Sequence, residues 1–290
     1  RIMDAVKPLA PVELPLLEAW GCVLAQDATA TYDIPPFASS SMDGYAVRSA
    51  DIKGASPSSP AVLKKVGEAP IGHPPKESVG VGEAIWIATG APVPEGSDCI
   101  APIEEIVEQG DTVKVLKEFD TGSFVRPAGQ DLRRGDVVVR AGRRLGGPEL
   151  GVLSSAGYPT VPVHPRVRVA VLSTGDELVE PGVEAAYGQI PDANSFTLWG
   201  SLAEAGAIPK RLGIVEDDEV KLRAAITGGL EEADCFITSG GVSVGQRDVV
   251  KRILEGLGTI ERYKVSMQPG APQAFGLVEG KPFFGLPGNP

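Results

Sequence analysis

The chain has 290 residues, 42% of them hydrophobic, so it is long enough for about two domains and apolar enough to form packed cores. Its net charge of −11, without a basic patch, argues against a free-standing nucleic-acid-binding protein, and no apolar run approaches the ~20 residues that span a bilayer. Cys22, Cys99 and Cys235 stand far apart in apolar stretches, which predicts reduced core residues in a cytoplasmic protein. With only two histidines, a zinc cluster is a poor interpretation. Arg1 is an unusual first residue, from which we expect missing N-terminal residues.

The first half of the chain divides into segments with different residue patterns. Residues 1–30 begin with a short helix near 2–6, and residues 137–165 combine strands with one helix. Between them, residues 31–136 consist of short alternating runs punctuated by Pro and Gly, which is typical of an all-β unit. The runs behind these predictions are 84–90 and 111–119 in the β-rich part, the strands 137–139 and 161–163, and the helix 148–156.

From residue 166 the pattern becomes regular, because apolar strands alternate with amphipathic helices. This alternation predicts a parallel, doubly wound α/β sheet. Gly206 is expected to end one helix, and Asp217 is expected to be the N-cap of the next. The expected strands are 167–172, 208–215 and 235–238, the expected helices are 194–205, 217–232 and one starting at 249, and a hairpin is expected to turn at 279–281. Phe196, Trp199, Leu202 and Ala203 are expected on one face of the first helix, Val220, Ala224 and Leu230 are expected to point inward from the second, and Val249, Val250, Ile253, Leu254 and Leu257 are expected on one side of the third.

Two loops whose residues could bind a ligand follow strands of this sheet. STGDE (173–177) and the glycine-rich SGGVSVGQRD (239–248) should meet at the carboxyl edge, where doubly wound sheets bind ligands. Bare backbone amides bind anions, and the carboxylates Asp176, Glu177 and Asp248 suit Mg²⁺. The sequence therefore favours a Mg²⁺-dependent site for a phosphorylated ligand. The alternative is a pair of tight turns whose acids are solvated or cap a helix.

Other loops carry weaker indications. In GQIPDANS (188–195), one of Asp192, Asn194 and Ser195 should cap the following helix, and Asp192 is also a candidate for the same cleft. In the β-rich part, Asp43 and Thr89 lie in Gly- and Pro-rich loops that could be simple turns. Arg126 is of the residue type that pairs with oxyanions, although a lone arginine is usually only solvated.

Taken together and in this order, the motifs resemble the MoeA/gephyrin E-domain family, the molybdopterin molybdenumtransferases. The resemblance covers essentially the whole chain. The α/β part is also similar to the MogA-type molybdopterin adenylyltransferases. The matching segments are PPF…SMDGYAVR (35–48), TGAPVPEGSD (89–98), the VR…AG..D pattern (125–131), STGDEL (173–178), GQI.DAN (188–194), SGGVSVGQRD (239–248), PG.P.AFG (269–276) and GLPGNP (285–290).

The resemblance implies a fold of class α/β plus β. Residues 1–30 and 137–165 would form a split linker and dimerisation domain of α+β type, residues 31–136 a β-rich domain, and residues 166–290 a MogA-like, doubly wound domain. The family's C-terminal β-barrel would follow and is absent from this chain. An elongated homodimer is also implied, in which Asp43, Thr89 and Arg126 of one subunit join the α/β loops of the other in a composite site.

The implied reaction is Mg²⁺-dependent insertion of molybdate into adenylated molybdopterin, with release of AMP. The resemblance assigns Asp248, Glu177 and Asp176 to the metal, with Asp248, Glu177, Asp43, Thr89 and Arg126 as catalytic residues. It also suggests a molybdopterin adenylyltransferase as a partner. The residues assigned to binding are Ser173, Thr174, Gly175, Asp192, Asn194, Asp217, Ser239, Gly240, Gly241, Ser243, Lys264 and Pro272.

This chain also departs from the family pattern. Gln268 and Ala271 replace the two lysines of the usual KPGKP, which predicts weak affinity for molybdate unless Arg262, Lys264 or a residue past Pro290 supplies the charge. These losses favour a second interpretation, a catalytically weak or scaffold relative that binds a molybdopterin nucleotide. A third interpretation, an adenylyltransferase, is disfavoured by the β-rich part. The choice between molybdate and tungstate stays open.

Overall fold

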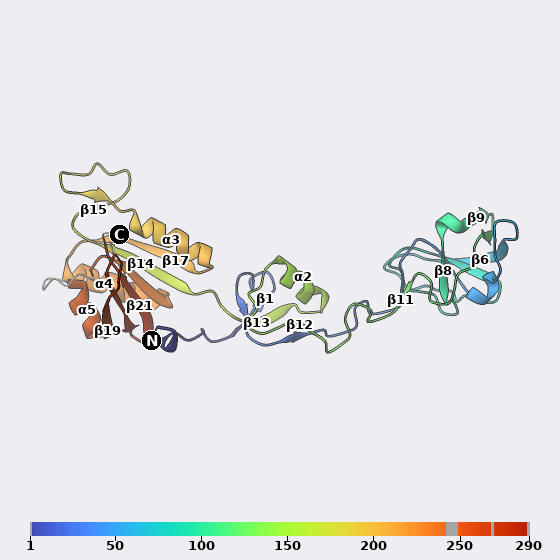
Figure 1. Cartoon of the computed structure of the whole chain (residues 1–290), viewed down its shortest axis with the longest axis horizontal. Helices are drawn as coiled ribbons and strands as arrows, with labels where there is room; N and C mark the ends of the chain where they lie inside the picture. The colour runs from blue at the N-terminus through green and yellow to red at the C-terminus, as the bar shows by residue number, and fades with distance from the viewer. Residues whose placement is uncertain (1, 242–248, 268–269, 289–290) are drawn as a thin grey trace. The chain divides into compact units, whose positions relative to one another are not determined.

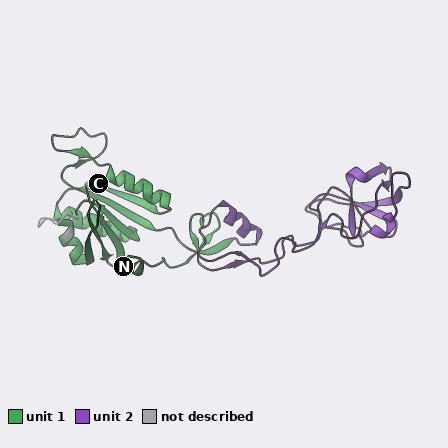
Figure 2. Cartoon of the chain, viewed as in Figure 1, with its two compact units in different colours: residues 1–25, 142–146, 160–290 green, residues 26–141, 147–159 purple. Residues whose placement is uncertain are grey.

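The structure, a computed structural model, describes residues 2–241, 249–267 and 270–288 (Figure 1). By internal contacts the chain divides into two units, drawn in Figure 2. Unit 1 comprises residues 1–25, 142–146 and 160–290, and unit 2 comprises residues 26–141 and 147–159. The division into three domains that the resemblance implies stays a prediction. No helix in the described part of the chain combines the length and apolar character needed to cross a membrane.

A six-stranded sheet of order β17-β14-β18-β21-β20-β19 forms the centre of unit 1. The first four strands run parallel, as predicted for β14, β17 and β18, and β20 pairs antiparallel with both β21 and β19. The predicted hairpin joins β20 to β21 through Glu279 and Gly280, which both have positive φ. The bounds are β14 (Arg168–Thr174), β17 (Ile208–Val215), β18 (Cys235–Ser239), β19 (Gly258–Lys264), β20 (Pro272–Val278) and β21 (Lys281–Leu286).

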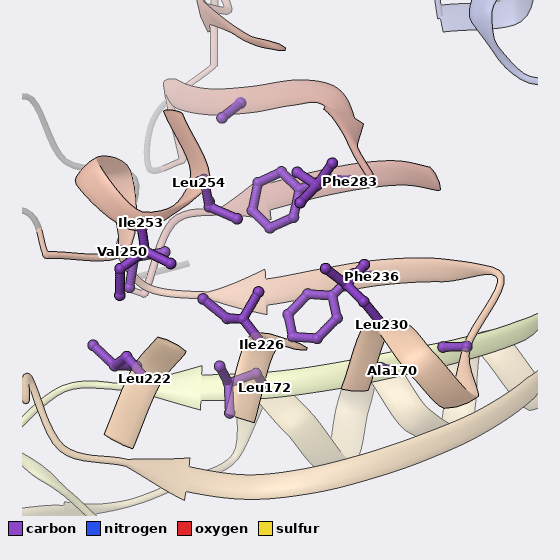
Figure 3. Close-up of a cluster of buried hydrophobic side chains, with 13 residues drawn as sticks. Ala170, Leu172, Leu222, Ile226, Leu230, Phe236, Val250, Ile253, Leu254 and Phe283 are labelled. Carbon is purple, nitrogen blue, oxygen red and sulfur yellow. The ribbon is translucent and has the colours of Figure 1, made fainter. Parts of the chain in front are cut away.

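Helices cover both faces of this sheet, as predicted for a doubly wound domain. Alternate residues of a strand point to opposite faces, so Val169 and Val171 meet α3 (Asn194–Ala205), whereas Ala170 and Leu172 lie on the other face. That second face carries α4 (Glu219–Glu232) and α5 (Val249–Leu257). Figure 3 shows their side chains, Leu222, Ile226, Leu230, Val250, Ile253 and Leu254, gathered around Phe236 and Phe283.

The inward residues predicted for α4 were right only at Leu230, and only part of the face predicted for α3 packs on the sheet. On α3, Phe196 and Trp199 are about half exposed, and Leu198 packs on the sheet beside the correctly predicted Leu202. Apolar residues occur around most of α3, so periodicity alone does not choose its buried side. On α4, Val220 is 78% exposed and Ala224 is exposed as well. The buried residues of α4 are Leu222, Ile226, Gly229 and Leu230.

The predicted cap of α4 was also wrong by one residue. Asp218 is the N-cap, because its carboxylate accepts hydrogen bonds from the backbone N–H groups of Val220 and Lys221. Asp217 instead accepts a bond from Thr174. Gly206, by contrast, ends α3 in the left-handed conformation, as predicted.

The remainder of unit 1 contains a short helix and two small sheets. The N-terminal helix α1 (Ile2–Ala5) and the strand around 161–163 agree with prediction. A three-stranded sheet has the order β1-β13-β2, and β15 pairs with β16 in the excursion between β14 and α3. The bounds are β1 (Val12–Pro15), β2 (Val23–Leu24), β13 (Thr160–His164), β15 (Leu178–Val179) and β16 (Ile190–Pro191).

Unit 2 is built mainly on a six-stranded sheet of order β8-β5-β7-β6-β10-β9, in agreement with the predicted all-β part. Its two apolar clusters include Tyr45 and Leu63 in one and Ile85 and Ile100 in the other. The sheet strands are β5 (Gly44–Val47), β6 (Ala61–Ala69), β7 (Glu83–Ile87), β8 (Cys99–Pro102), β9 (Ile106–Gln109) and β10 (Thr112–Val115), with the 3-10 turns η1 (Ser49–Ile52) and η2 (Ile103–Glu105). Outside it lie the helix α2 (Gly147–Ser155) and two strand pairs, β12 (Val137–Val139) with β3 (Ala28–Thr29) and β11 (Val125–Arg126) with β4 (Ser39–Ser40).

All three cysteines are buried and free, as predicted for reduced core residues. Burial raises the pKa of the Cys235 thiol to about 11 and that of Cys99 to about 12. Both thiols therefore stay protonated and unreactive at neutral pH.

Candidate functional site

The loops that follow the four parallel strands meet at one edge of the unit 1 sheet. The N–H of Gly240, after β18, donates to the carbonyl oxygen of Leu286 at the end of β21 (3.0 Å). A Cβ on Gly240 would lie 2.5 Å from the carbonyl oxygen of Thr174, at the end of β14. A Cβ on Gly288 would lie 3.4 Å from the Cα of Gly240. The described parts of the two predicted loops, 173–177 and 239–241, therefore lie together.

Glycine is required at the turn after β18. Gly240 and Gly241 have φ values of 93° and 68°, in the left-handed region that side chains disfavour. A Cβ on Gly241 would lie 2.6 Å from Val250 of α5. The turn thus brings bare backbone close to both β14 and α5. Ser243 and Asp248, which were predicted to complete this loop, lie outside the described residues.

Three acidic residues gather beside this turn. The Thr174 hydroxyl donates to Asp217 Oδ1 (2.8 Å), and the Asp217 N–H donates to Asp176 Oδ1 (3.2 Å). The Glu177 carboxylate folds back over Gly175, where a Cβ would lie 2.5 Å from Glu177 Oε2. These oxygens come from the ends of two neighbouring strands, β14 and β17.

The acidic residues fit Mg²⁺ by the chemistry of their donors. All are hard oxygen ligands, and Mg²⁺ is usually held by one or two carboxylates, waters and substrate phosphates rather than by a protein cage. No group of three or more acidic, histidine or cysteine residues that could hold one metal ion occurs in the described ranges. Asp176, Glu177 and Asp217 therefore do not form a complete metal site by themselves, and any of them would hold the ion only together with other ligands such as waters or substrate phosphates.

Asn194 joins two of the loops from the opposite side. It lies in the first turn of α3, and its Nδ2 donates to Ser239 Oγ (2.9 Å) and to the carbonyl oxygen of Gly288 (2.8 Å). A cleft of about 270 Å³ opens beside it, and its lining is mostly apolar. The cleft is lined by Asn194, Thr197, Leu198, Ser239, Met267, Gly270, Gln273, Leu286 and Pro287.

Asp192 occupies a different environment from the one considered for it. Asp192 is 2% exposed, and its carboxylate accepts hydrogen bonds from the N–H (3.2 Å) and hydroxyl (2.6 Å) of Ser195. The expectation that Asp192, Asn194 or Ser195 is the cap of α3 was wrong, because Ala193 is the N-cap and makes no side-chain capping bond. Asp192 also pairs with Arg211 (3.1 Å). Burial opposes ionisation, but hydrogen bonds from Ser195 and Arg211 outweigh it and lower the pKa of Asp192. Asp192 is therefore a buried anion beneath the start of α3.

Sequence reasoning missed Arg211 and its partner Glu180. The Arg211 guanidinium binds both oxygens of Glu180 at 2.9 Å each. Neither residue belongs to a recognisable motif, and the available signal was a pair of basic residues, Lys210 and Arg211, inside a strand that is otherwise apolar.

Lys264 and Pro272 face each other where β19 and β20 begin to separate. An open hollow of about 730 Å³ surrounds them, lined by Lys264, Val265, Ser266, Met267, Gly270, Ala271 and Pro272. Ala271, which stands where the family commonly has lysine, adds no charge to it. Gln268 lies outside the described residues.

In unit 2, the predicted residues Asp43 and Thr89 are in direct contact. Asp43 Oδ1 accepts hydrogen bonds from the N–H (2.7 Å) and hydroxyl (3.0 Å) of Thr89. Arg126 lies on β11, and β11 pairs with β4, which shortly precedes Asp43 in the sequence. The Arg126 guanidinium binds Asp131 at 2.8 Å. The structure thus brings the three β-rich motifs together locally. The composite site with another subunit stays a prediction.

Comparison with known proteins covers both halves of the chain. Residues 1–157 match the family described as MoeA N-terminal region (domain I and II), and residues 170–290 match the probable molybdopterin binding domain.

Full-length relatives show the same similarity. Molybdopterin molybdenumtransferase 2 of Mycobacterium tuberculosis is 37% identical over 295 residues, covering 100% of this chain and 73% of the relative. Molybdopterin molybdenumtransferase of Haemophilus influenzae is 38% identical over 278 residues, covering 96% and 68%. The crystal structure of the molybdopterin biosynthesis MoeA protein of Pyrococcus horikosii superposes with a TM-score of 0.82 at 35% identity, covering 100% of this chain and 73% of that one.

Proposed function

The chain belongs to the MoeA family of molybdopterin molybdenumtransferases, and we propose that it inserts molybdate into adenylated molybdopterin in a Mg²⁺-dependent step that releases AMP. The observation that carries this proposal is the convergence of Thr174, Asp217 and the glycine turn at 240–241 on one sheet edge. Bare amides beside carboxylates are what a phosphoanhydride and its cation require together.

Each group at the edge has a role in this proposal. The backbone at Gly241 and the hydroxyl of Ser239 hold the phosphates of the nucleotide, whereas the Gly240 N–H already donates to Leu286 and fixes the turn. Asp176, Glu177 and Asp217, with Asp248, hold Mg²⁺ or its waters. When bound, Mg²⁺ supplies positive charge that offsets the charge on the phosphates during cleavage. The Thr174 hydroxyl, by donating to Asp217, fixes the orientation of that carboxylate.

The cleft beside Asn194 suits the pterin of the substrate. Its apolar walls, Leu198 and Leu286, can cover a flat ring, and the amides of Asn194 and Gln273 can bond to the ring edge. Lys264 is the described cation in the neighbouring hollow and would attract molybdate.

We further propose a homodimer in which Asp43, Thr89 and Arg126 of one subunit face the sheet edge of the other. The Asp43–Thr89 contact holds the loop at 88–92 in one conformation. A site that is completed by a second surface requires a loop fixed in this way. Binding of adenylated molybdopterin without turnover is the second candidate function. The absence of charge at Ala271 favours it, because a neutral side chain cannot balance a dianion.

A molybdate titration tests the proposal. The protein is incubated with adenylated molybdopterin and Mg²⁺, and AMP is measured by chromatography with and without a chelator. AMP release that depends on both molybdate and Mg²⁺ is expected. Nucleotide binding without AMP release would favour the second function, and consumption of ATP with free molybdopterin would indicate an adenylyltransferase.

Two adjacent aspartates provide a matched pair of variants. Asp217→Asn removes a charge from the proposed site, whereas Asp218→Asn removes one from an exposed helix cap that asparagine replaces well. AMP release should fall at least ~100-fold in the first, the scale of losing a group that stabilises developing charge, and stay near wild type in the second. Equal activity of the two variants would contradict the assignment of Asp217. Asp248→Asn should also lose AMP release.

A further inference from the structure

We propose that Arg211 is a positioning residue for this site: through Asp192 and Ser195 it fixes the first turn of α3 and so orients the Asn194 amide between the loops of β18 and β21. The inference rests on the function proposed for that edge. Arg211 does not line the cleft, and it acts through its neighbours.

The contacts of Arg211 join three segments of unit 1. From β17, its Nε donates to Ser195 Oγ (2.6 Å), and its Nη2 donates to Asp192 Oδ2 (3.1 Å) and to both carboxylate oxygens of Glu180. The guanidinium also lies 4.5 Å from the centroid of the Phe196 ring. Its side chain is 20% exposed. A planar, forked cation can make these contacts at once, whereas an ammonium cannot.

The same contacts hold the backbone on either side of Asn194. Asp192 and Ser195 are both buried, and the Ser195 hydroxyl donates to Asp192 while accepting from Arg211. Asn194 lies between them in the chain, so its Cα is fixed from both sides. Only then can one amide group reach Ser239 Oγ and the Gly288 carbonyl together. A rotation of this first turn would break both bonds.

A purely structural role makes a different prediction. If Arg211 only tethers the excursion at 178–192 through Glu180, its loss would lower stability without changing the surroundings of Asn194. A readout specific for Asn194 therefore separates the two roles.

The sequence offers such a readout, because Asn194 and Asn289 are the only asparagines among the 290 residues. Labelling with [15N]asparagine gives two side-chain amide signals, and Asn194→Ala identifies which belongs to Asn194. In Arg211→Gln, we expect the Asn194 amide signal to shift and its hydrogen exchange to quicken ~10-fold or more, as for a broken hydrogen bond. Arg168→Gln, which removes an arginine–aspartate pair at the other end of β14, should leave that signal unchanged. An unaltered Asn194 signal in folded Arg211→Gln would overturn the proposal.

A double-mutant cycle adds a functional readout. Arg211→Gln and Asn194→Ala should each lower kcat/KM for AMP release ~10-fold, and the double variant should lose no more than either alone, because both break the same link. A double variant ~100-fold below wild type would mean independent action and would refute the proposal. If Arg211→Gln does not fold, Arg211→Lys, which keeps the charge but loses the fork, replaces it in both experiments. A wild type without AMP release would refute the proposed function, whereas the NMR result would still decide the positioning role.

Discussion

Two consecutive glycines in α4 should respond oppositely to the same substitution. Gly228 is exposed, and a Cβ built on it meets nothing within 4 Å. Gly229 is buried, and its Cβ would lie 2.6 Å from Phe236 Cε2 and 2.7 Å from Leu212 Cδ1. Carbon atoms pack at about 3.5–4.0 Å, so these two side chains must move by roughly 1 Å.

The magnitudes follow from two opposing terms. Glycine in a helix interior costs about 0.8–1.0 kcal/mol relative to alanine, so Gly228→Ala should raise the free energy of unfolding by up to that amount. Gly229→Ala gains the same term but overpacks the core, which costs about 1–3 kcal/mol. The propensity term is common to both variants, so their difference isolates the packing term. We expect Gly229→Ala to be about 1–3 kcal/mol less stable than Gly228→Ala.

Thermal unfolding followed by circular dichroism measures this difference. For a unit of this size, 1 kcal/mol corresponds to a Tm shift of about 2–4 °C. Gly228→Ala should melt above wild type and Gly229→Ala below it. Equal Tm values for the two variants would refute the packing of α4 against Phe236 and Leu212.

Three further outcomes are expected. Asp218→Ala should lower the free energy of unfolding by about 1 kcal/mol in urea titrations, because the α4 cap is lost. Asp217→Ala should lower the free energy of unfolding by less, and the reverse order would make Asp217 the cap. The hydrogen bond from Arg168 lowers the pKa of Asp234, so the folded state binds fewer protons than the unfolded state, where the pKa is about 3.9. The stability from this pair should be present above about pH 4 and be lost as the pH falls through the lower pKa that Asp234 has in the folded state. In that pH range the urea midpoint of Asp234→Asn should vary less with pH than the wild-type midpoint. Parallel curves of urea midpoint against pH for the two proteins would contradict this. Gly44→Ala should destabilise unit 2 by at least ~1–3 kcal/mol, because a Cβ would lie 2.1 Å from the backbone oxygen of Ala101; an unchanged Tm would argue against the β5–β8 pairing.

The sequence predicted most elements of the α/β part because strand and helix periodicities are local properties. The strand near 208–215, the helix ending at Gly206 and the hairpin at 279–281 agree with the structure. It also predicted that the loops after β14 and β18 meet, since parallel strands place their carboxyl ends at one edge.

Local patterns were insufficient where several residues could serve equally well. Either Asp217 or Asp218 could begin α4. Asp218 is the cap, and Asp217 instead accepts a hydrogen bond from Thr174, which lies 43 residues earlier in the chain. Phe196 and Trp199 are as apolar as Leu198, so the exposed face of α3 depends on which side meets the sheet and on the guanidinium of Arg211 beside Phe196.

By itself, the sequence determined the elements, the order of the motifs and the family, because these depend on short segments and their spacing. Tertiary structure alone decided which polar groups meet: Thr174 with Asp217, Asn194 with Ser239, and Arg211 with Asp192. A hydrogen bond acts over about 3 Å, and its geometry depends on residues that are distant in the chain. Packing therefore sets which pairs of residues meet at the site, whereas the sequence sets which residue types are present to form it.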